Sequence, residues 1–233
     1  MFVLKTDTGL ILFDTGSYGS ADRILKSIKA AGFEPETIKA ICLTHWHGDH
    51  TGGLAGITAF LGANQSLDIF IGEADLPLLK DQSFHLLRFH PFLQLPVLHG
   101  PGRLPNSSNA RFCPLNTAGC EILHQKYGIT AIDTPGHTPG HMAYLHRETG
   151  SLFSGCALSL LTPHVAGLVP VFHDRAEQIR SGEYLAGMDF RYLLPAHMCL
   201  RRDEIPLERR RPVSGKKGVV SKLMGDHLFF KIL

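Results

Sequence analysis

The sequence predicts a mixed α/β (α+β) domain, on three observations. Short apolar segments alternate with segments whose apolar residues recur at helical spacing, and Gly- or Pro-containing turns separate them. The chain has 233 residues, 44% of them hydrophobic and 19% charged, which is enough to bury a substantial core. No apolar run approaches the roughly 20 residues that a membrane-spanning helix needs.

Composition and charge limit the expected partners and the expected cellular location. A formal net charge of +2 is close to balance, so we expect no nucleic-acid partner. The N-terminal residues lack a basic and then apolar export signal, and the five cysteines are scattered, so we expect a cytoplasmic protein without a disulfide framework. We expect one domain over residues 1–200 and a basic, weakly specified tail at 201–233.

The first half of the chain predicts strands and helices in alternation. A turn at Asp7-Thr8-Gly9 separates two short apolar strands, so the chain is expected to enter the fold as a hairpin. Apolar residues at helical spacing, followed by Gly32, predict a helix over 21–31. Further strands are expected at 40–43 and 67–71, and further helices at 51–61 and 73–80.

The second half begins with a segment that has no clear pattern. Residues 81–117 contain several prolines, and we expect a long loop there, of the kind that forms a functional lid or a disordered insertion. Strands are then expected at 121–124, 129–133, 142–146 and 151–153, a helix at 174–186 and a last strand at 192–194.

The most concentrated chemistry follows the strand at 40–43. Because alternate residues at a strand end point to one side, His45 and His47 are expected to face the same way, and Asp49 and His50 follow in the next turn. Four good metal ligands in six residues are costly to bury unless something compensates them. The alternative is a polar loop, but a metal is the simplest compensation, so we predict a metal site.

Three further candidate ligands also stand where an apolar strand ends. His137 follows the strand at 129–133, Cys156 follows the strand at 151–153, and His197 follows the strand at 192–194. Such strand ends, followed by rigid turns, are common places for sites. The alternatives are a turn histidine for His137 and a small buried apolar side chain for Cys156. Four strand ends that each carry a ligand predict one shared metal centre.

In this order the motifs resemble those of the metallo-β-lactamase superfamily, the MBL-fold metallo-hydrolases. The resemblance rests on Asp14-Thr15-Gly16, on His-x-His-x-Asp-His from His45 to His50, on Thr134 through His137 and on Pro195 through His197. It spans about residues 3–200. It implies a four-layer αββα sandwich with the site at one edge between the sheets.

The resemblance also implies how the ligands divide. His45, His47 and His137 would hold one metal, whereas Asp49, His50 and His197 would hold the second. Zinc is the usual metal of the family, so we expect two Zn²⁺ per chain.

The implied activity is that of a zinc-dependent hydrolase. Zinc lowers the pKa of bound water to about 7, so a zinc-bound hydroxide can attack a carbonyl at neutral pH. Asp49 is the expected catalytic residue, which orients the nucleophile and shuttles its proton. The expected substrate is a small-molecule ester, thioester or lactone.

The chain departs from the family at two places. Most members have a bridging aspartate where this chain has Cys156. One subclass of zinc β-lactamases resembles it there, with a cysteine that ligates the second zinc, but usually lacks a histidine at the place of His50, so the chain resembles a hybrid. Members also carry one or two strands before the first one seen here, which implies that these strands are missing and that a sheet edge is exposed.

Two other functions stay open. A genuine zinc β-lactamase is favoured by Cys156 and opposed by the missing export signal. A catalytically impaired metal-binding scaffold would follow if loss of the bridging carboxylate leaves one metal or none. A nuclease is not expected, because the balanced charge gives no phosphate-binding surface. We expect a small-molecule substrate and no membrane partner.

Residues near the predicted ligands are assigned supporting roles. His141 and Asp133 are expected to support the ligands rather than bind metal. His164 and the apolar residues Phe84, Phe89, Phe92 and Leu93 are candidates for lining or capping the pocket, although packing under a loop is favoured for the apolar ones. The other histidines are expected at the surface or in loops: His85, His90, His99, His124, His146, His164, His173 and His227.

Overall fold

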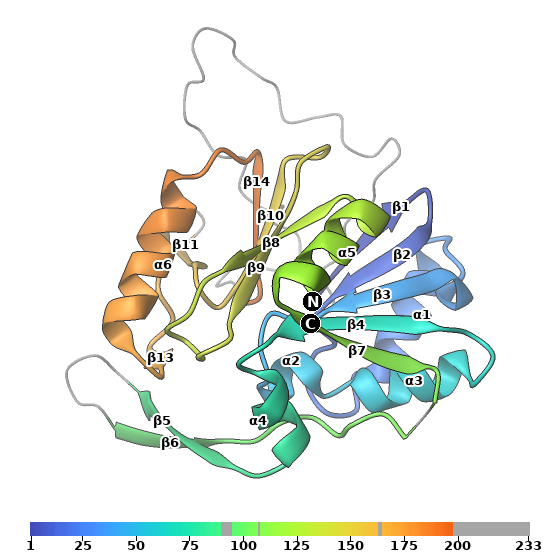
Figure 1. The fold of residues 1–233 in the computed structure, drawn as a ribbon, viewed down its shortest axis with the longest axis horizontal. Helices are drawn as coiled ribbons and strands as arrows, with labels where there is room; N and C mark the ends of the chain where they lie inside the picture. Colours follow the sequence, from blue (N-terminus) through green and yellow to red (C-terminus); the bar gives the residue numbers. More distant parts are fainter. Residues whose placement is uncertain (90–94, 107, 163–164, 198–233) are drawn as a thin grey trace, which may run out of the picture.

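The computed structural model describes residues 1–89, 95–106, 108–162 and 165–197, and the predicted tail at 201–233 lies outside them. Two β-sheets face each other, with α1 and α3 on the outer side of one and α6 on the outer side of the other (Figure 1). This is the four-layer αββα arrangement. No helix in the described part of the chain is both long and apolar enough to cross a membrane.

The first sheet has five strands in the order β1-β2-β3-β4-β7. β1 pairs antiparallel with β2 as the predicted hairpin, and the remaining pairs are parallel. The strands are β1 (Phe2–Thr6), β2 (Gly9–Phe13), β3 (Ile38–Cys42), β4 (Leu67–Gly72) and β7 (Ala110–Leu115), and the connecting helices are α1 (Ala21–Ala30), the 3₁₀ turn η1 (Pro35–Thr37), α2 (Gly48–Thr51), α3 (Leu54–Leu61) and α4 (Leu76–Asp81).

The second sheet has four strands in the order β14-β10-β9-β8. β14 pairs parallel with β10, whereas β9 pairs antiparallel with both β10 and β8. The carboxyl ends of β8, β10 and β14 therefore meet at one edge. The elements of the chain from residue 117 onwards are α5 (Thr117–Tyr127), β8 (Ile129–Asp133), β9 (Met142–His146), β10 (Ser151–Gly155), β11 (Ser159–Thr162), β12 (Val165–Gly167), β13 (Val171–Phe172), α6 (Arg175–Gly187) and β14 (Tyr192–Pro195). Of these, β11 and β12 pair with each other outside the second sheet, and β13 pairs with β5 (His85–Phe89).

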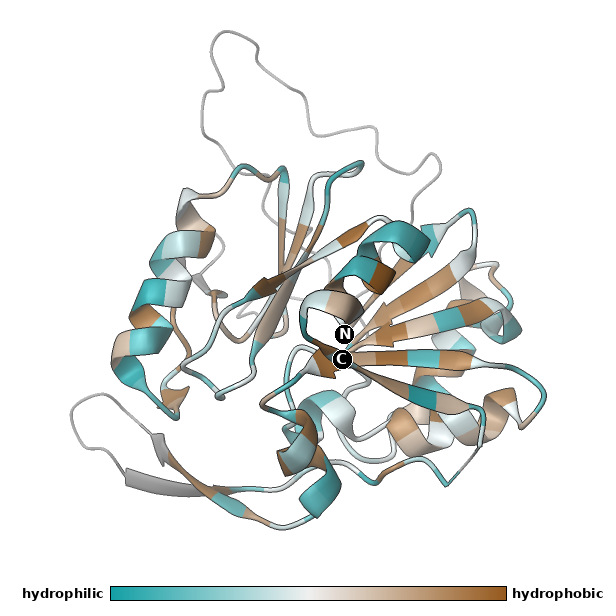
Figure 2. Ribbon diagram, viewed as in Figure 1, coloured by the Kyte–Doolittle hydropathy of each residue, from teal (hydrophilic) through white to brown (hydrophobic). Residues whose placement is uncertain are grey.

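Strand alternation divides the apolar residues among three cores. In β2, Leu10 and Leu12 pack under α1 and α3, whereas Ile11 and Phe13 point between the sheets. A third cluster lies between the second sheet and α6, where Leu185 packs. Figure 2 shows the resulting apolar colouring along the strands, with polar residues on the outward sides of α5 and α6. Three cores between four layers confirm the predicted fold class.

The strand predicted at 121–124 is wrong, because these residues lie within α5. The Asn116 side chain accepts a hydrogen bond from the Gly119 N–H at 3.2 Å, and Gly128 ends the helix with a φ of 68°. The buried residues Gly119, Leu123 and Tyr127 are four apart, which is helical spacing. The four residues 121–124 are too few to show this helical period, and they do not include the capping residues Asn116 and Gly128.

The long loop predicted over 81–117 is also wrong in part. The segment contains a hairpin of β5 (His85–Phe89) and β6 (Leu95–His99), which β13 extends, and then β7 of the first sheet. Pro96 lies in β6 and Pro114 in β7, and both strands are at a sheet edge. Edge strands tolerate proline because one side of the backbone needs no ladder hydrogen bond.

The helix predicted at 51–61 is broken after Thr51. A Cβ on Gly52 would lie 2.1 Å from the backbone N of Tyr18, and one on Gly53 would lie 2.4 Å from the carbonyl O of Thr15. The loop after β2 therefore passes directly against this backbone. This contact separates α2 from α3 and brings the Asp14-Thr15-Gly16 motif to the loop that carries His45, His47 and His50.

Candidate metal centre

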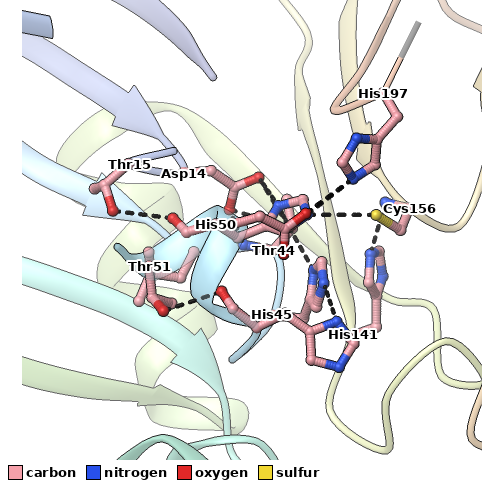
Figure 3. Close-up of polar contacts among 12 residues, drawn as sticks. Asp14, Thr15, Thr44, His45, His50, Thr51, His141, Cys156 and His197 are labelled. Atoms are coloured by element: carbon pink, nitrogen blue, oxygen red, sulfur yellow. Dashed lines mark hydrogen bonds and ion pairs between the residues drawn. The ribbon is translucent and has the colours of Figure 1, made fainter. Parts of the chain in front are cut away.

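The predicted ligands lie together although four strands of two sheets deliver them. His45 and His47 follow β3, His137 follows β8, Cys156 follows β10 and His197 follows β14. Figure 3 shows the side chains of His45, His50, Cys156 and His197 pointing towards one another. Their convergence supports one shared centre, and metal binding by these residues stays a prediction from the sequence.

Three imidazoles form a closed group, which we call the histidine triad: His45, His47 and His137. His45 Nε2 lies 2.9 Å from His47 Nδ1, and His137 Nε2 lies 3.1 Å and 3.2 Å from the same two atoms. With zinc–nitrogen bonds of about 2.0–2.1 Å, tetrahedral ligand nitrogens are about 3.3 Å apart. All three side chains are buried. The triad therefore has nearly the size of a zinc site.

The second set, which we call the mixed group, consists of Asp49, His50, Cys156 and His197. Asp49 Oδ2 lies 3.4 Å from His50 Nε2 and 3.3 Å from His197 Nε2, and these two nitrogens are 3.3 Å apart. Cys156 Sγ lies 3.5 Å from His50 Nε2. The spacing again matches tetrahedral ligands. Unlike the triad, this group reaches the surface, since the side chains of Asp49 and His197 are 40% and 53% exposed.

Outer hydrogen bonds orient the imidazoles. His50 Nδ1 donates to Asp14 Oδ2 at 2.8 Å, and His137 Nδ1 donates to the carbonyl of Val171 at 2.7 Å. His45 Nδ1 lies 3.0 Å from the hydroxyl of Thr44. With the Nδ1 proton placed outward, each Nε2 directs a lone pair into the centre, which is the form that binds metal.

Asp14 has a role that sequence reasoning did not assign, although its motif was recognised. Its carboxylate accepts hydrogen bonds from the Thr44 N–H at 2.7 Å and from His50. Asp14 has a φ of 62°, which is uncommon outside glycine but tolerated by aspartate. The next residue, Thr15, donates from both N and Oγ1 to the carbonyl of His50. The motif thus holds the loop that carries the ligands.

Asp75 is a second residue without a predicted role. This fully buried carboxylate, before α4, accepts hydrogen bonds from the Trp46 N–H, the Thr138 hydroxyl and the Gly140 N–H. Trp46 lies between two triad ligands, and Thr138 follows the third, His137. Asp75 therefore ties together the two loops of the triad. Burial raises the pKa of Asp75 to about 6, against the opposing effect of these hydrogen bonds.

His141 supports a ligand, as predicted. Its Nδ1 lies 2.8 Å from the Thr134 hydroxyl, and its Nε2 accepts a hydrogen bond from the Cys156 N–H at 3.0 Å. Both ring nitrogens are thus engaged outside the centre, and His141 holds the backbone of Cys156. Asp133 is exposed at the end of β8, and no support of a ligand by it is observed.

The two groups differ in electrostatics. Burial holds the pKa of His45 and of His47 well below the usual value, so both stay neutral. Burial opposes the charge of Asp49, but the neighbouring His50 and His197 hold its pKa well below the usual value. The hydrogen bond to Asp49 contributes most to raising the pKa of His197 to about 9. The mixed group is therefore a charged cluster.

Cys156 belongs to this charged cluster. Its side chain is buried, and burial opposes a thiolate. The imidazoles of His137 and His50 outweigh that effect and hold the pKa of Cys156 well below its usual value. A thiolate is the form in which cysteine binds metal, so this lowered pKa is consistent with the predicted ligand role of Cys156.

The expectation for the remaining histidines is wrong at three positions, His85, His99 and His146. His99, at the end of β6, stacks on His47 with ring centroids 4.4 Å apart and lies within ligand distance of His47 and Asp49. Its only sequence signal was a histidine between apolar residues and a glycine, inside the segment predicted as a loop. His146 is buried beside Thr149. His124 and His173 are exposed as expected, and His90, His164 and His227 lie outside the described residues.

The pocket-lining residues have mixed outcomes. His85, which was expected at the surface or in a loop, is half-buried in β5 and packs against Trp46 with ring centroids 5.0 Å apart. Phe84 is 69% exposed, so it does not pack under a loop. Phe92 and Leu93 lie outside the described residues, as does the side chain of Phe89.

Several known proteins are similar to this chain in sequence. The sequence is similar to the uncharacterized protein YobT of Bacillus subtilis, with 28% identity over 232 residues, which cover 93% of this chain and 90% of that protein. It is 27% identical over 168 residues to an N-acyl homoserine lactonase of Bacillus sp, which cover 62% of this chain and 56% of the lactonase. The chain spans little more than half the length of several other curated relatives.

A solved structure is similar to this chain in both sequence and fold. BJP-1, a subclass B3 metallo-beta-lactamase of Bradyrhizobium japonicum, is 27% identical, and the superposition has a TM-score of 0.52 and covers 83% of this chain and 69% of that one. The family described as the metallo-beta-lactamase superfamily matches residues 1–197, which is most of the sequence. The match, the fold and the histidine motifs together show that the chain belongs to the metallo-β-lactamase superfamily of hydrolases.

Proposed function

We propose that this chain is a zinc-dependent hydrolase that cleaves a small-molecule ester, thioester or lactone. The observation that carries the proposal is the pair of ligand sets, the triad and the mixed group, placed side by side at one edge of the sheets. When bound, zinc supplies a hydroxide at neutral pH and polarises a carbonyl. The similarity to an N-acyl homoserine lactonase supports the choice of a carbonyl substrate.

The residues fit metal ions for a physical reason. His45 Nε2 and His137 Nε2 face each other at 3.1 Å, and the Nδ1 of each has an outer partner, the Thr44 hydroxyl and the Val171 carbonyl. In the tautomers that carry the proton on Nδ1, both Nε2 atoms turn a lone pair inward and neither can donate to the other. Two facing lone pairs in a buried site repel unless a cation lies between them. We propose that the triad holds one metal and that Asp49, His50, His197 and Cys156 hold the second, two per chain.

The donor set supports zinc. The triad offers imidazoles alone, and the mixed group adds a thiolate, and both kinds of ligand suit zinc better than they suit manganese or magnesium. A carboxylate completes the set at Asp49. Elemental analysis of chain purified with zinc present, compared with manganese and iron, would test the metal's identity.

Asp49 is proposed as the catalytic residue. Its depressed pKa keeps it ionised at neutral pH, and 40% of its side chain is exposed, so it can meet a substrate. A carboxylate in this position can orient the attacking nucleophile and accept its proton. His45 and His47 are buried and cannot take that role.

The test is a comparison of zinc-loaded chain with Asp49→Asn, which preserves the shape of the side chain. Turnover of a p-nitrophenyl ester, an acyl thioester, an acyl homoserine lactone and nitrocefin would be measured, with Asp22→Asn, an exposed carboxylate on α1, as the control. We expect one of the first three substrates to be hydrolysed by the wild type and the control but not by Asp49→Asn. Full zinc occupancy without turnover of any probe would favour a catalytically impaired scaffold.

A zinc β-lactamase is the second candidate. The placement of Cys156 in the mixed group favours it, and so does the similarity to a subclass B3 enzyme. Nitrocefin hydrolysis faster than that of the lactone and ester probes would establish it. The expected absence of a nucleic-acid partner and the cytoplasmic location stay predictions from the sequence.

A further inference from the structure

Cys156 lies between the two ligand sets rather than at the outer side of one. Its Sγ lies 3.5 Å from His50 Nε2 of the mixed group, and it interacts there with His197 as well. It also faces the triad, because ligand atoms of His45, His50 and Cys156 all lie within 4.8 Å of one another and because it interacts with His137. One sulfur atom thus contacts both sets.

The backbone around Cys156 is built to hold this position. Gly155 has a φ of 55°, and a Cβ there would meet His141 Nε2 at 2.6 Å and the Thr44 Cβ at 2.8 Å. The Cys156 N–H donates to His141 Nε2, and the Ser154 hydroxyl donates to the Leu158 carbonyl. The turn is therefore fixed on both sides of the cysteine, and the sulfur has little freedom to withdraw.

The spacing suits a metal ligand on each side. With zinc–sulfur and zinc–nitrogen bonds of about 2.3 and 2.0–2.1 Å, a tetrahedral zinc places a sulfur about 3.6 Å from a nitrogen, close to the distance between Cys156 Sγ and His50 Nε2. A thiolate sulfur keeps further lone pairs after one bond. A single atom that joins two metals with such bonds sets them about 3.5–4 Å apart, the usual separation in two-metal sites.

Charge also favours sharing. The triad offers imidazoles alone, whereas the mixed group offers the carboxylate of Asp49 and the sulfur of Cys156 and has Asp14 behind His50. A thiolate confined to the mixed group would leave the triad metal with no anionic protein ligand. A thiolate shared by both metals distributes the negative charge more evenly in a buried site.

We propose that the thiolate of Cys156 bridges the two metals and bonds to the triad metal and to the mixed-group metal at once. This inference rests on the proposed two-metal function.

X-ray absorption at the zinc edge of the two-zinc protein tests the bridge independently of activity. A bridging sulfur is counted by both metals, so we expect about one sulfur per zinc and a zinc–zinc distance of about 3.5–4 Å. A sulfur bound to the second metal alone gives about half a sulfur per zinc. The ¹¹³Cd-substituted protein should show two resonances, both at thiolate shifts and coupled to each other.

Matched variants separate the bridge from the fold. Cys156→Ser should lose the sulfur signal and fall towards one zinc per chain, whereas Cys156→Asp should lose the sulfur signal but keep two zincs, because a carboxylate can also bridge. Cys120→Ser, a half-buried cysteine on α5, should leave the absorption spectrum unchanged. Circular dichroism would confirm that each variant is folded.

The outcomes distinguish the two proposals. Half a sulfur per zinc with two zincs bound overturns the bridge and leaves the hydrolase intact. A chain that binds fewer than two zincs at saturation overturns the bridge, and absence of any stoichiometric metal overturns the proposed function too. About one sulfur per zinc, together with loss of that signal in Cys156→Ser, supports the bridge.

Discussion

The triad and the mixed group use adjacent positions on the same fold in different ways. The triad is closed, buried and made of three imidazoles, and burial holds the pKa of His45 and His47 well below the usual value. The mixed group combines a carboxylate, a thiolate and two imidazoles, and its Asp49 and His197 reach the surface. A closed set of like ligands favours holding a metal, whereas an open and charged set can also meet a substrate. We expect the two groups to respond differently to substitution.

The largest expected effect is at the triad. His137→Ala removes one of three buried ligands, and metal catalysis supplies several kcal/mol of transition-state stabilisation, so we expect kcat/KM to fall by about a thousandfold. Zinc per chain should fall at the same time. Kinetics and elemental analysis on one preparation would check this. If the variant kept full zinc and near-normal turnover, the triad would not be the anchoring site.

The buried Asp75 carboxylate behind the triad should make the free energy of unfolding depend on pH. The pKa of Asp75 in the folded chain is about 6, above the 3.8 of an ordinary aspartate. Folding therefore favours the protonated acid. This contribution is present below about pH 4 and is lost as the pH rises through 6, for a difference of about 3 kcal/mol.

The variant Asp75→Asn isolates the contribution of Asp75 to the pH dependence of stability. Urea unfolding of the metal-free wild type and of the variant, between pH 4 and 7, should show that the wild type loses more stability over that range. The difference between the two curves is what matters, because histidines that titrate in this range do so in both proteins. Parallel curves would contradict the raised pKa of Asp75 and mean that its carboxylate is ionised over the whole range.

A smaller effect is expected at the open side. His197→Ala removes a half-exposed ligand of the mixed group, whose other members remain, so we expect kcat/KM to fall by about tenfold to a hundredfold. Zinc should decrease from about two towards one per chain, and the triad metal should be retained. His124→Ala, an exposed histidine on α5, is the control. An effect as large as that of His137→Ala would erase the distinction between the two groups.

The smallest effect is expected beside the centre, at His99. His99 stacks on His47 from the end of β6, half-buried and next to Asp49, where it can donate one hydrogen bond to a substrate. His99→Ala should raise KM by about threefold to tenfold and leave the zinc content unchanged, and His99→Gln should restore part of the loss. His85→Ala is the control, because His85 pairs with His99 in the hairpin but packs on Trp46. A change in kcat alone would contradict a role in substrate binding.

Local sequence determined the parts of this protein that depend on near neighbours. Hydrophobic period and turn residues predicted the strands of the two facing sheets except β7, and most of the helices. The spacing from His45 to His50 predicted a metal-ligand loop, because four candidate ligands lie within six residues. Where the decisive signal lay outside a short window, the prediction was wrong. The caps of α5 at Asn116 and Gly128 and the edge positions of β6 and β7 are of this kind.

Tertiary structure decided how distant residues combine. The parallel register of β10 and β14 brings Cys156 and His197 to one edge, and the facing sheets place them against His50, more than a hundred residues from either. Packing also places the hairpin that carries His99 beside the centre. It likewise brings Asp75 within hydrogen-bond distance of the two loops of the triad. A sequence motif specifies which side chains are available as ligands. Distances between them come from strand register and layer packing, which act over separations that no local pattern encodes.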